Sequence, residues 1–261
     1  MRRIHIVWAL LFAAAVLAGA AAAVAGRGET AHTTASTVAE PTSAASTSAA
    51  VSEPPPSEPP LSEPAPPATG TLLVERFTAN RRDWPESTSP YSRLVVRGGG
   101  YRIAVTTPNG FEQPTAELSA PAAGVELDAV LEQHGRLAGA GLSCLDSSGT
   151  GLEFLIDAPT GRYSVWAATA DAAFEVTRGR SDRIHRQGRN RLHAVCGAPG
   201  DAVVLAVNGS RLALVSGAAE IAELTGQSYA PGPFATAGLP VEAGRSSGAV
   251  VYDDLVVRAT G

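Results

Sequence analysis

Apolar and polar residues alternate in short runs from residue 71 to the end of the chain, and this pattern predicts β-strands. Gly, Pro and Asn separate the runs, as in Pro159-Thr160-Gly161. The pair Asn208-Gly209 lies between Val203–Val207 and Arg211–Val215 and predicts a two-residue hairpin. One short stretch, Ala218–Leu224, is typical of a helix.

The other strand-like runs are spread over the whole of residues 71–261. They are Thr71–Phe77, Leu94–Val96, Tyr101–Val105, Thr115–Leu118, Val125–Leu131, Ala140–Leu145, Gly151–Ile156, Tyr163–Ala167, Ala173–Val176, Arg191–Cys196, Phe234–Gly238 and Ala249–Val257. So many strands with almost no helix indicate an all-β domain, either a two-sheet sandwich or a barrel.

The amino terminus has the pattern of an export signal. Arg2 and Arg3 precede an uncharged, mainly apolar run from Ile4 to Gly26, and about 20 such residues span a bilayer as a helix. The arginines would stay cytoplasmic, so residues 4–25 are predicted to anchor the chain in the cell membrane with its carboxyl-terminal domain outside. Ala23-Val24-Ala25 also fits a signal-peptidase site, and cleavage after Ala25 would make the protein secreted.

Residues 27–70 are rich in Pro, Ser, Thr and Ala and contain no aromatic residue. Such a segment cannot bury enough apolar surface to offset its ordering entropy, so a disordered stalk is expected. The chain is therefore predicted to comprise an anchor or signal peptide (1–26), a stalk (27–70) and a β-domain (71–261).

Net charge and cysteine content indicate which partners and which covalent cross-links to expect. The formal net charge of −5 argues against nucleic acid as a partner, because that role needs a basic surface. The chain has two cysteines, Cys144 and Cys196, both in predicted strands. In an exported protein such a pair favours a disulfide, with two free buried thiols as the alternative.

Several short motifs along the β-domain together carry a family resemblance. In order they are Asp83-Trp84-Pro85, Gly99-Gly100-Tyr101-Arg102-Ile103, Ala140-Gly141-Leu142-Ser143-Cys144, Gly161-Arg162-Tyr163-Ser164-Val165, Asn190-Arg191-Leu192-His193-Ala194-Val195-Cys196, Val207-Asn208-Gly209 and Tyr252-Asp253-Asp254-Leu255-Val256-Val257. The set resembles the concanavalin A-like, laminin G-like domains of actinobacterial exported or membrane-anchored surface proteins. A related group is named for hydrolysis of keto-disaccharides.

The resemblance implies a two-sheet antiparallel jelly-roll sandwich. In that family the cysteine pair is commonly a disulfide between neighbouring strands, and the Asn-Gly pair marks a hairpin.

Trp166 is the main candidate for ligand binding. If Tyr163 and Val165 face the core, the period of two sends Ser164 and Trp166 to the outer face of the sheet, and Arg162 shares that face. An indole can stack on a sugar ring, while Arg162 and Ser164 can hydrogen-bond its hydroxyl groups.

Two other regions offer further candidates. Trp84 is predicted to lie in a loop, where it would either stack on a sugar or plug the core. Arg183 and His185 belong to an Arg-rich loop that would either bind an anionic glycan or form a solvated surface.

Glu126, Asp128 and Glu132 are predicted to share one face of a strand. The segment resembles the Glu-x-Asp-x-(x)-Glu strand of family 16 glycosidases, but its last Glu is one residue too far along the chain. We therefore expect charged residues on a solvent-facing strand rather than a catalytic pair. No cofactor and no metal ion are expected.

These observations favour an extracytoplasmic, non-catalytic binding or sensor module for carbohydrate or cell-wall glycan over an enzyme. The first alternative is a structural or adhesion protein without a small ligand. The second is a hydrolase of glycans such as keto-disaccharides or β-glucans.

Overall fold

The computed structural model describes residues 70–169, 172–197 and 201–260. The predicted anchor and stalk lie outside these ranges, apart from Gly70, which begins the first strand. Within the described part of the chain, no helix is long and apolar enough to cross a membrane.

The described residues form strands almost throughout. The strands are β1 (Gly70–Glu75), β2 (Ser87–Thr88), β3 (Ser92–Arg97), β4 (Gly100–Val105), β5 (Phe111–Glu112), β6 (Thr115–Ala122), β7 (Gly124–Asp146), β8 (Gly151–Asp157), β9 (Arg162–Ala168), β10 (Ala173–Arg180), β11 (Arg189–Cys196), β12 (Val203–Val207), β13 (Ser210–Val215), β14 (Phe234–Gly238) and β15 (Val241–Thr260). The helix α2 (Ala218–Thr225) and the 3-10 turn η1 (Ala158–Thr160) complete the described elements.

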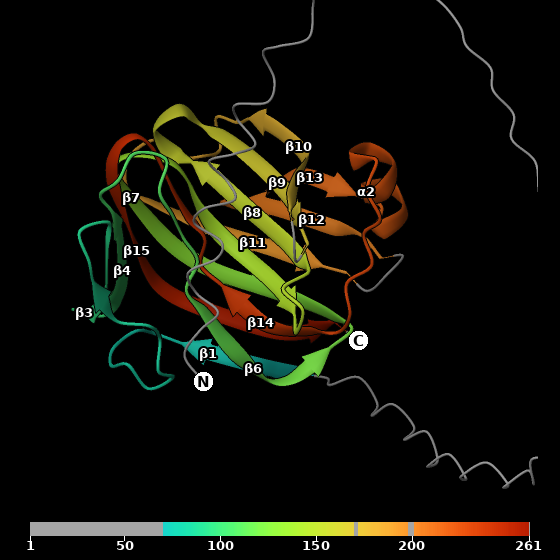
Figure 1. Ribbon diagram of the computed structural model, residues 1–261, viewed down its shortest axis with the longest axis horizontal. Coiled ribbons are helices and arrows are strands. Elements are labelled where there is room, and N and C mark those ends of the chain that lie inside the picture. Colours follow the sequence, from blue (N-terminus) through green and yellow to red (C-terminus); the bar gives the residue numbers. More distant parts are fainter. Residues whose placement is uncertain (1–69, 170–171, 198–200, 261) are drawn as a thin grey trace, which may run out of the picture. The chain divides into compact units, whose positions relative to one another are not determined.

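The strands are arranged in two antiparallel layers (Figure 1). The β11 layer runs β13-β12-β11-β7-β15, and β1 and β4 both pair with the far side of β15. The β8 layer runs β10-β9-β8-β7-β14-β6. This arrangement confirms the predicted two-sheet sandwich and excludes the alternative of a closed barrel.

β7 belongs to both layers, which the sequence did not indicate. Its first half pairs with β11 from Val125 to Glu132, and its second half pairs with β8 from Ala140 to Leu145. The sequence predicted two separate strands here, because the residues between them lack clear alternation. In the structure the strand continues through them. One continuous strand therefore contributes buried side chains to both layers.

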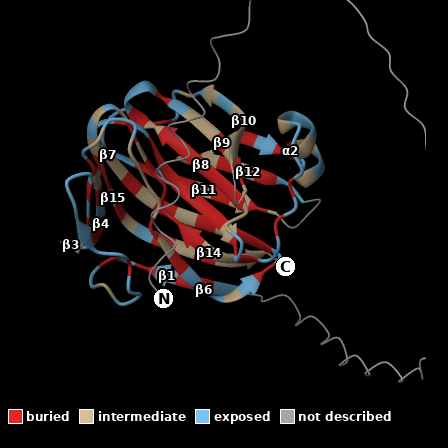
Figure 2. Ribbon diagram, viewed as in Figure 1, coloured by how far each residue is buried: buried red, intermediate tan, exposed pale blue. Residues whose placement is uncertain are grey.

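The core lies between the layers and follows the predicted alternation. Leu127 and Leu131 of β7 are fully buried, as are Phe154 and Ile156 of β8. Figure 2 shows buried positions running along the strands of both layers, while exposed positions gather at the turns. Burial of these apolar side chains is the main force that holds the layers together.

The Asn208-Gly209 turn has the predicted form. Asn208 and Gly209 have φ angles of 50° and 79°, the left-handed values that a two-residue hairpin turn requires. Val207 pairs with Ser210, so β12 and β13 form the expected hairpin.

Cys144 and Cys196 form the predicted disulfide, with their Cα atoms 6.6 Å apart. The resemblance implied a bond between neighbouring strands, and β7 and β11 are indeed paired neighbours, although the bond does not follow their register. Cys196 ends β11 beside Val125, whereas Cys144 lies in the half of β7 that pairs with β8. The bond therefore crosses the core and joins the two layers.

Candidate functional site

Side chains on the outer face of β8, β9 and β10 form three cross-strand rows. The first row is Glu153–Trp166–Glu175, the second is Leu155–Ser164–Arg178 and the third is Asp157–Arg162–Arg180. Directly paired residues of antiparallel strands share one face, and the alternate residues Leu152, Phe154 and Val165 are buried in the core. The three rows therefore face away from the core.

This face is hollowed to a volume of about 530 Å³, which falls within the range of small-ligand sites. The hollow is lined by Ala138, Leu155, Asp157, Arg162, Tyr163, Ser164, Glu175, Arg178, Gly179 and Arg180. Two of the residues predicted to bind ligand, Arg162 and Ser164, are thus brought together here. Trp166 follows them on the same face of β9.

Trp166 has the predicted orientation. Its neighbours Val165 and Ala167 are buried, whereas Trp166 is only partly buried. Its indole Nε1 donates a hydrogen bond of 2.9 Å to Ser164 Oγ, which holds the ring along the strand. Such a ring can accept a sugar by stacking.

Glu153 lies beside Trp166 and has an unusual environment. The residue is only 7% exposed, and Gln113 Nε2 donates to its Oε1 at 2.9 Å and to Ser143 Oγ at 3.0 Å. Burial, together with the charge of Glu242, raises the pKa of Glu153 to about 7, although the hydrogen bond from Gln113 opposes the rise. Glu153 can therefore carry and release a proton near neutral pH.

Glu175 stands on the other side of Trp166. Its Oε1 lies 3.3 Å from Arg178 Nε, so the carboxylate forms an ion pair on the surface of the hollow. Trp166 thus has a buried, protonatable carboxyl on one flank and an ion-paired carboxylate on the other.

Asp157, the third acid of this face, has a structural task. Its side chain accepts hydrogen bonds from the backbone N–H and the hydroxyl of Thr160, and so caps the η1 turn. β8 therefore presents Glu153, Leu155 and Asp157 at alternating positions, with a leucine between the two acids.

Arg183 and His185 do not reach the hollow. The backbone N–H of His185 donates to Asn190 Oδ1 at 2.8 Å, and the carbonyl of Arg183 accepts from Asn208 Nδ2 at 2.7 Å. Asn190 is fully buried, so this loop is tied to the hairpin turn rather than directed toward Trp166. The two residues thus lie apart from the hollow, and the anionic-glycan site considered for their loop stays a prediction.

Trp84 is a core residue, and its proposed role in ligand binding is also corrected. It is 1% exposed, and its ring centroid lies 5.6 Å from that of Phe77 and 5.5 Å from that of Tyr101. No sugar can stack on a ring enclosed in this way. The three aromatic rings instead close the core near the start of the domain.

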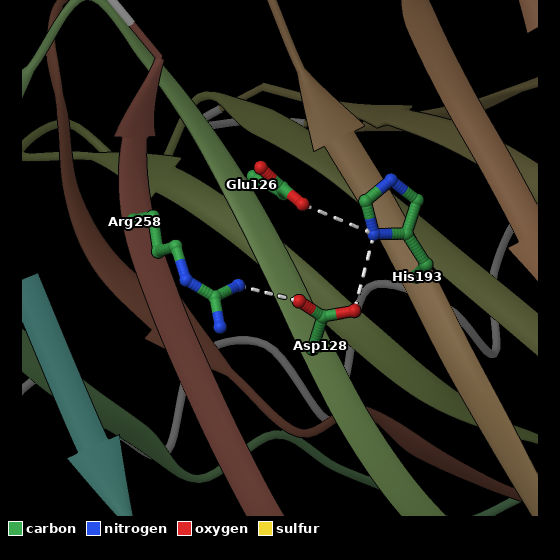
Figure 3. A network of polar contacts seen from close by, with 4 residues as sticks. All are labelled: Glu126, Asp128, His193 and Arg258. Atoms are coloured by element: carbon green, nitrogen blue, oxygen red, sulfur yellow. Dashed lines mark hydrogen bonds and ion pairs between the residues drawn. The ribbon is translucent and has the colours of Figure 1, made fainter. Parts of the chain in front are cut away.

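A second polar cluster lies on the outer face of the β11 layer (Figure 3). His193 Nδ1 lies 3.1 Å from Asp128 Oδ1 and 3.5 Å from Glu126 Oε1, and Arg258 Nη1 donates to Asp128 Oδ2 at 2.6 Å. Nothing in the sequence places His193 beside Asp128, because their register depends on the pairing of β11 with β7.

One ligand atom from each of Glu126, Asp128 and His193 lies within 4.8 Å of the other two, a spacing that a metal ion could use. Arg258 already supplies a positive charge to Asp128. Glu132 is not in the cluster, and its nearest ionic partner is His134 at 3.9 Å. The carboxylates that resemble the family 16 strand therefore lie in the opposite layer from Trp166.

The sequence analysis missed Glu153, Glu175 and Gln113. The alternation of Gly151–Ile156 does place Glu153 on the outer face, which was a usable signal. Nothing local indicates that Gln113, forty residues away, covers it.

No protein-family model and no curated protein matches the chain. Solved structures do match. The laminarinase catalytic domain of Thermotoga maritima MSB8 is 11% identical with a TM-score of 0.53, and the match covers 74% of this chain and 100% of that one. The Crh5 transglycosylase is 12% identical with a TM-score of 0.52, covering 75% and 88%. An endo-acting O-glycanase from the human gut microbiota is 10% identical with a TM-score of 0.50, covering 73% and 100%.

These similarities show the fold of the domain, a two-layer antiparallel jelly-roll sandwich like that of the three solved domains. They overturn the interpretation of the chain as a non-catalytic binding or sensor module and as a non-enzyme, because these solved domains of the same fold cleave or transfer glycans. At 10–12% identity the likeness concerns the fold, and the reaction of this chain has to be argued from its own residues.

Proposed function

We propose that the domain is a glycan-processing enzyme of the glycoside hydrolase or transglycosylase type. The glycan lies across the outer face of β8, β9 and β10. The observation that carries the proposal is the buried carboxyl group of Glu153 beside the partly buried indole of Trp166, where burial raises the pKa of Glu153 to about 7. Cleavage of a glycosidic bond needs such a proton donor together with a second carboxylate.

In the proposed reaction a sugar ring stacks on Trp166, between the two flanking acids. Gln113 donates to Oε1 of Glu153, so the proton of the neutral acid is carried by Oε2. That proton passes to the glycosidic oxygen, which leaves with the electron pair of the broken bond.

Glu175 serves as the second carboxylate. Its Cα lies two strand spacings, roughly 10 Å, from that of Glu153, and both side chains stand on one face. Glu175 either takes a proton from the attacking water or bonds to the anomeric carbon. The anomer of the first product, measured by NMR, distinguishes these two mechanisms. Asp157 is not assigned this role because Thr160 occupies its carboxylate.

The test is release of reducing sugar from a glycan panel that includes β-1,3-glucan, mucin O-glycans and keto-disaccharides. The first two are suggested by the enzymes of similar fold, and the third by the sequence resemblance. We expect Glu153→Gln and Glu175→Gln each to lower kcat by about a hundredfold or more.

Asp157→Asn is the matched control, since it removes a charge from the same strand face and should leave kcat within a few-fold of wild type. Wild-type rates in Glu153→Gln would overturn the proposal.

We further propose that the enzyme works outside the cytoplasm, anchored through residues 4–25 or released by cleavage after Ala25. The buried Cys144–Cys196 disulfide supports this, because such bonds persist mainly in oxidising compartments. Sequencing the amino terminus of the protein purified from membrane and culture medium separates the two forms. Recovery from the cytosol alone would contradict both.

A further inference from the structure

Two arginines face each other at the end of the hollow farthest from Trp166. Arg162 of β9 pairs directly with Arg180 of β10, and both side chains are exposed and line the hollow. Directly opposed residues have Cβ atoms about 5 Å apart, where two positive charges destabilise a sheet. The pair therefore costs stability unless a negative group lies between the two guanidinium groups.

The acids of the hollow do not supply that group. Asp157 lies opposite Arg162, but its carboxylate is directed to Thr160 and is not within ion-pair distance of Arg162. Glu175 is paired with Arg178. Within residues 70–169, 172–197 and 201–260, neither Arg162 nor Arg180 forms an ion pair, so the hollow presents two guanidinium groups to a ligand.

We propose that Arg162 and Arg180 bind the anionic group of an acidic glycan, either the carboxylate of a uronic acid or a sulfate ester. Arginine donors match the oxygen atoms of both groups. Trp166 lies four residues along β9 from Arg162, roughly 13 Å, so the stacked ring and the anionic group belong to different sugars of one chain. This inference rests on the proposed function, because it assigns the substrate class of the same face.

The experiment is calorimetric titration of the full chain with hexagalacturonate and with its methyl ester, which keeps the same sugar chain but carries no charge. A sulfated galactose oligomer is titrated in parallel and distinguishes sulfate from carboxylate as the preferred group. We expect at least about tenfold tighter binding of one charged probe than of the ester, and the difference should shrink as salt is raised.

The variant Arg162→Ala/Arg180→Ala should lose this discrimination. Its thermal unfolding temperature should stay the same or rise, since both residues are exposed and their mutual repulsion is removed. Arg211→Ala is the matched control, because Arg211 is an exposed strand arginine of the β11 layer. It should bind all probes as wild type does.

Equal affinity for the acid and the ester, no binding of either charged probe, or unchanged discrimination in the double variant overturns the inference. Its failure is separable from failure of the proposed function. If hydrolysis of a neutral glycan depends on Glu153 but charge discrimination is absent, only the anion subsite is wrong. If discrimination is present and Glu153→Gln leaves hydrolysis unchanged, the catalytic assignment is wrong and the subsite remains.

Discussion

Two tryptophans show how the immediate surroundings of a residue decide its role. Trp84 is enclosed by Phe77 and Tyr101, whereas Trp166 alternates with buried residues on an open strand face. The period of two was sufficient to place Trp166 from sequence. Trp84 follows no such period, so its burial depended on aromatic partners that only the fold brings together.

We predict opposite effects of truncating the two indoles. Trp166→Ala should weaken glycan binding by about 1–2 kcal/mol, since a stacked ring loses its platform, with little change in the unfolding free energy. Trp84→Ala should lower the unfolding free energy by about 3–5 kcal/mol. Denaturant unfolding and glycan titration of both variants check this, and unfolding of the domain by Trp166→Ala would contradict the assigned orientation.

Glu153 should make stability depend on pH. Its folded pKa of about 7 lies above the ordinary value of 4.5, so the folded state keeps a proton that the unfolded state releases first. The contribution of this group is therefore fully present below pH 4.5 and falls as pH rises to about 7. The loss is on the order of 3 kcal/mol.

The difference in unfolding free energy between wild type and Glu153→Gln isolates this contribution. We expect Glu153→Gln to gain stability relative to wild type between pH 4.5 and 7. A difference that does not change with pH would show that Glu153 titrates normally.

At the scale of elements, β7 and the disulfide connect the two layers. Cys144 and Cys196 are fully buried and close a loop of 52 residues across the core. Replacing both with alanine should lower the unfolding free energy by about 4 kcal/mol, because the unfolded chain regains the entropy of the open loop. Urea unfolding of the variant and of the reduced wild type should agree, and an unchanged midpoint in both would contradict the estimate.

Local signals explain which elements were predictable. Asn208-Gly209 specifies its own hairpin, because left-handed backbone angles favour these two residues. The buried side chain of Asn190, which accepts from the N–H of His185 and from Asn208 Nδ2, could not be foreseen. This hydrogen-bond network joins the His185 loop, β11 and the Asn208 turn, which meet only after β11 and β12 have paired.

At the scale of the whole molecule, the layers decide which acids share a face. The sequence drew attention to Glu126 and Asp128 because their spacing resembles a glycosidase strand. The fold places them in the β11 layer with His193 and Arg258, while Glu153 and Trp166 meet in the β8 layer. Alternation along one strand cannot reveal which layer the strand belongs to. The acids that share a face with Trp166 could therefore not be predicted from the sequence.

The cluster of the β11 layer should therefore matter little for catalysis. Asp128→Asn removes the partner of both Arg258 and His193, but these groups are partly exposed and their attraction is screened by water. We expect a loss of up to about 1 kcal/mol of unfolding free energy and glycan cleavage close to wild type. A large fall in kcat with the fold intact would place the active site in this layer instead.

The most direct test of Glu153 as the proton donor is the dependence of kcat/KM on pH for whichever glycan of the panel is cleaved best. The donor has to be protonated in the free enzyme, so kcat/KM should fall above an apparent pKa near 7, while the residual activity of Glu153→Gln should lack this limb. A wild-type kcat/KM that stays constant from pH 6 to 9 would contradict the assignment.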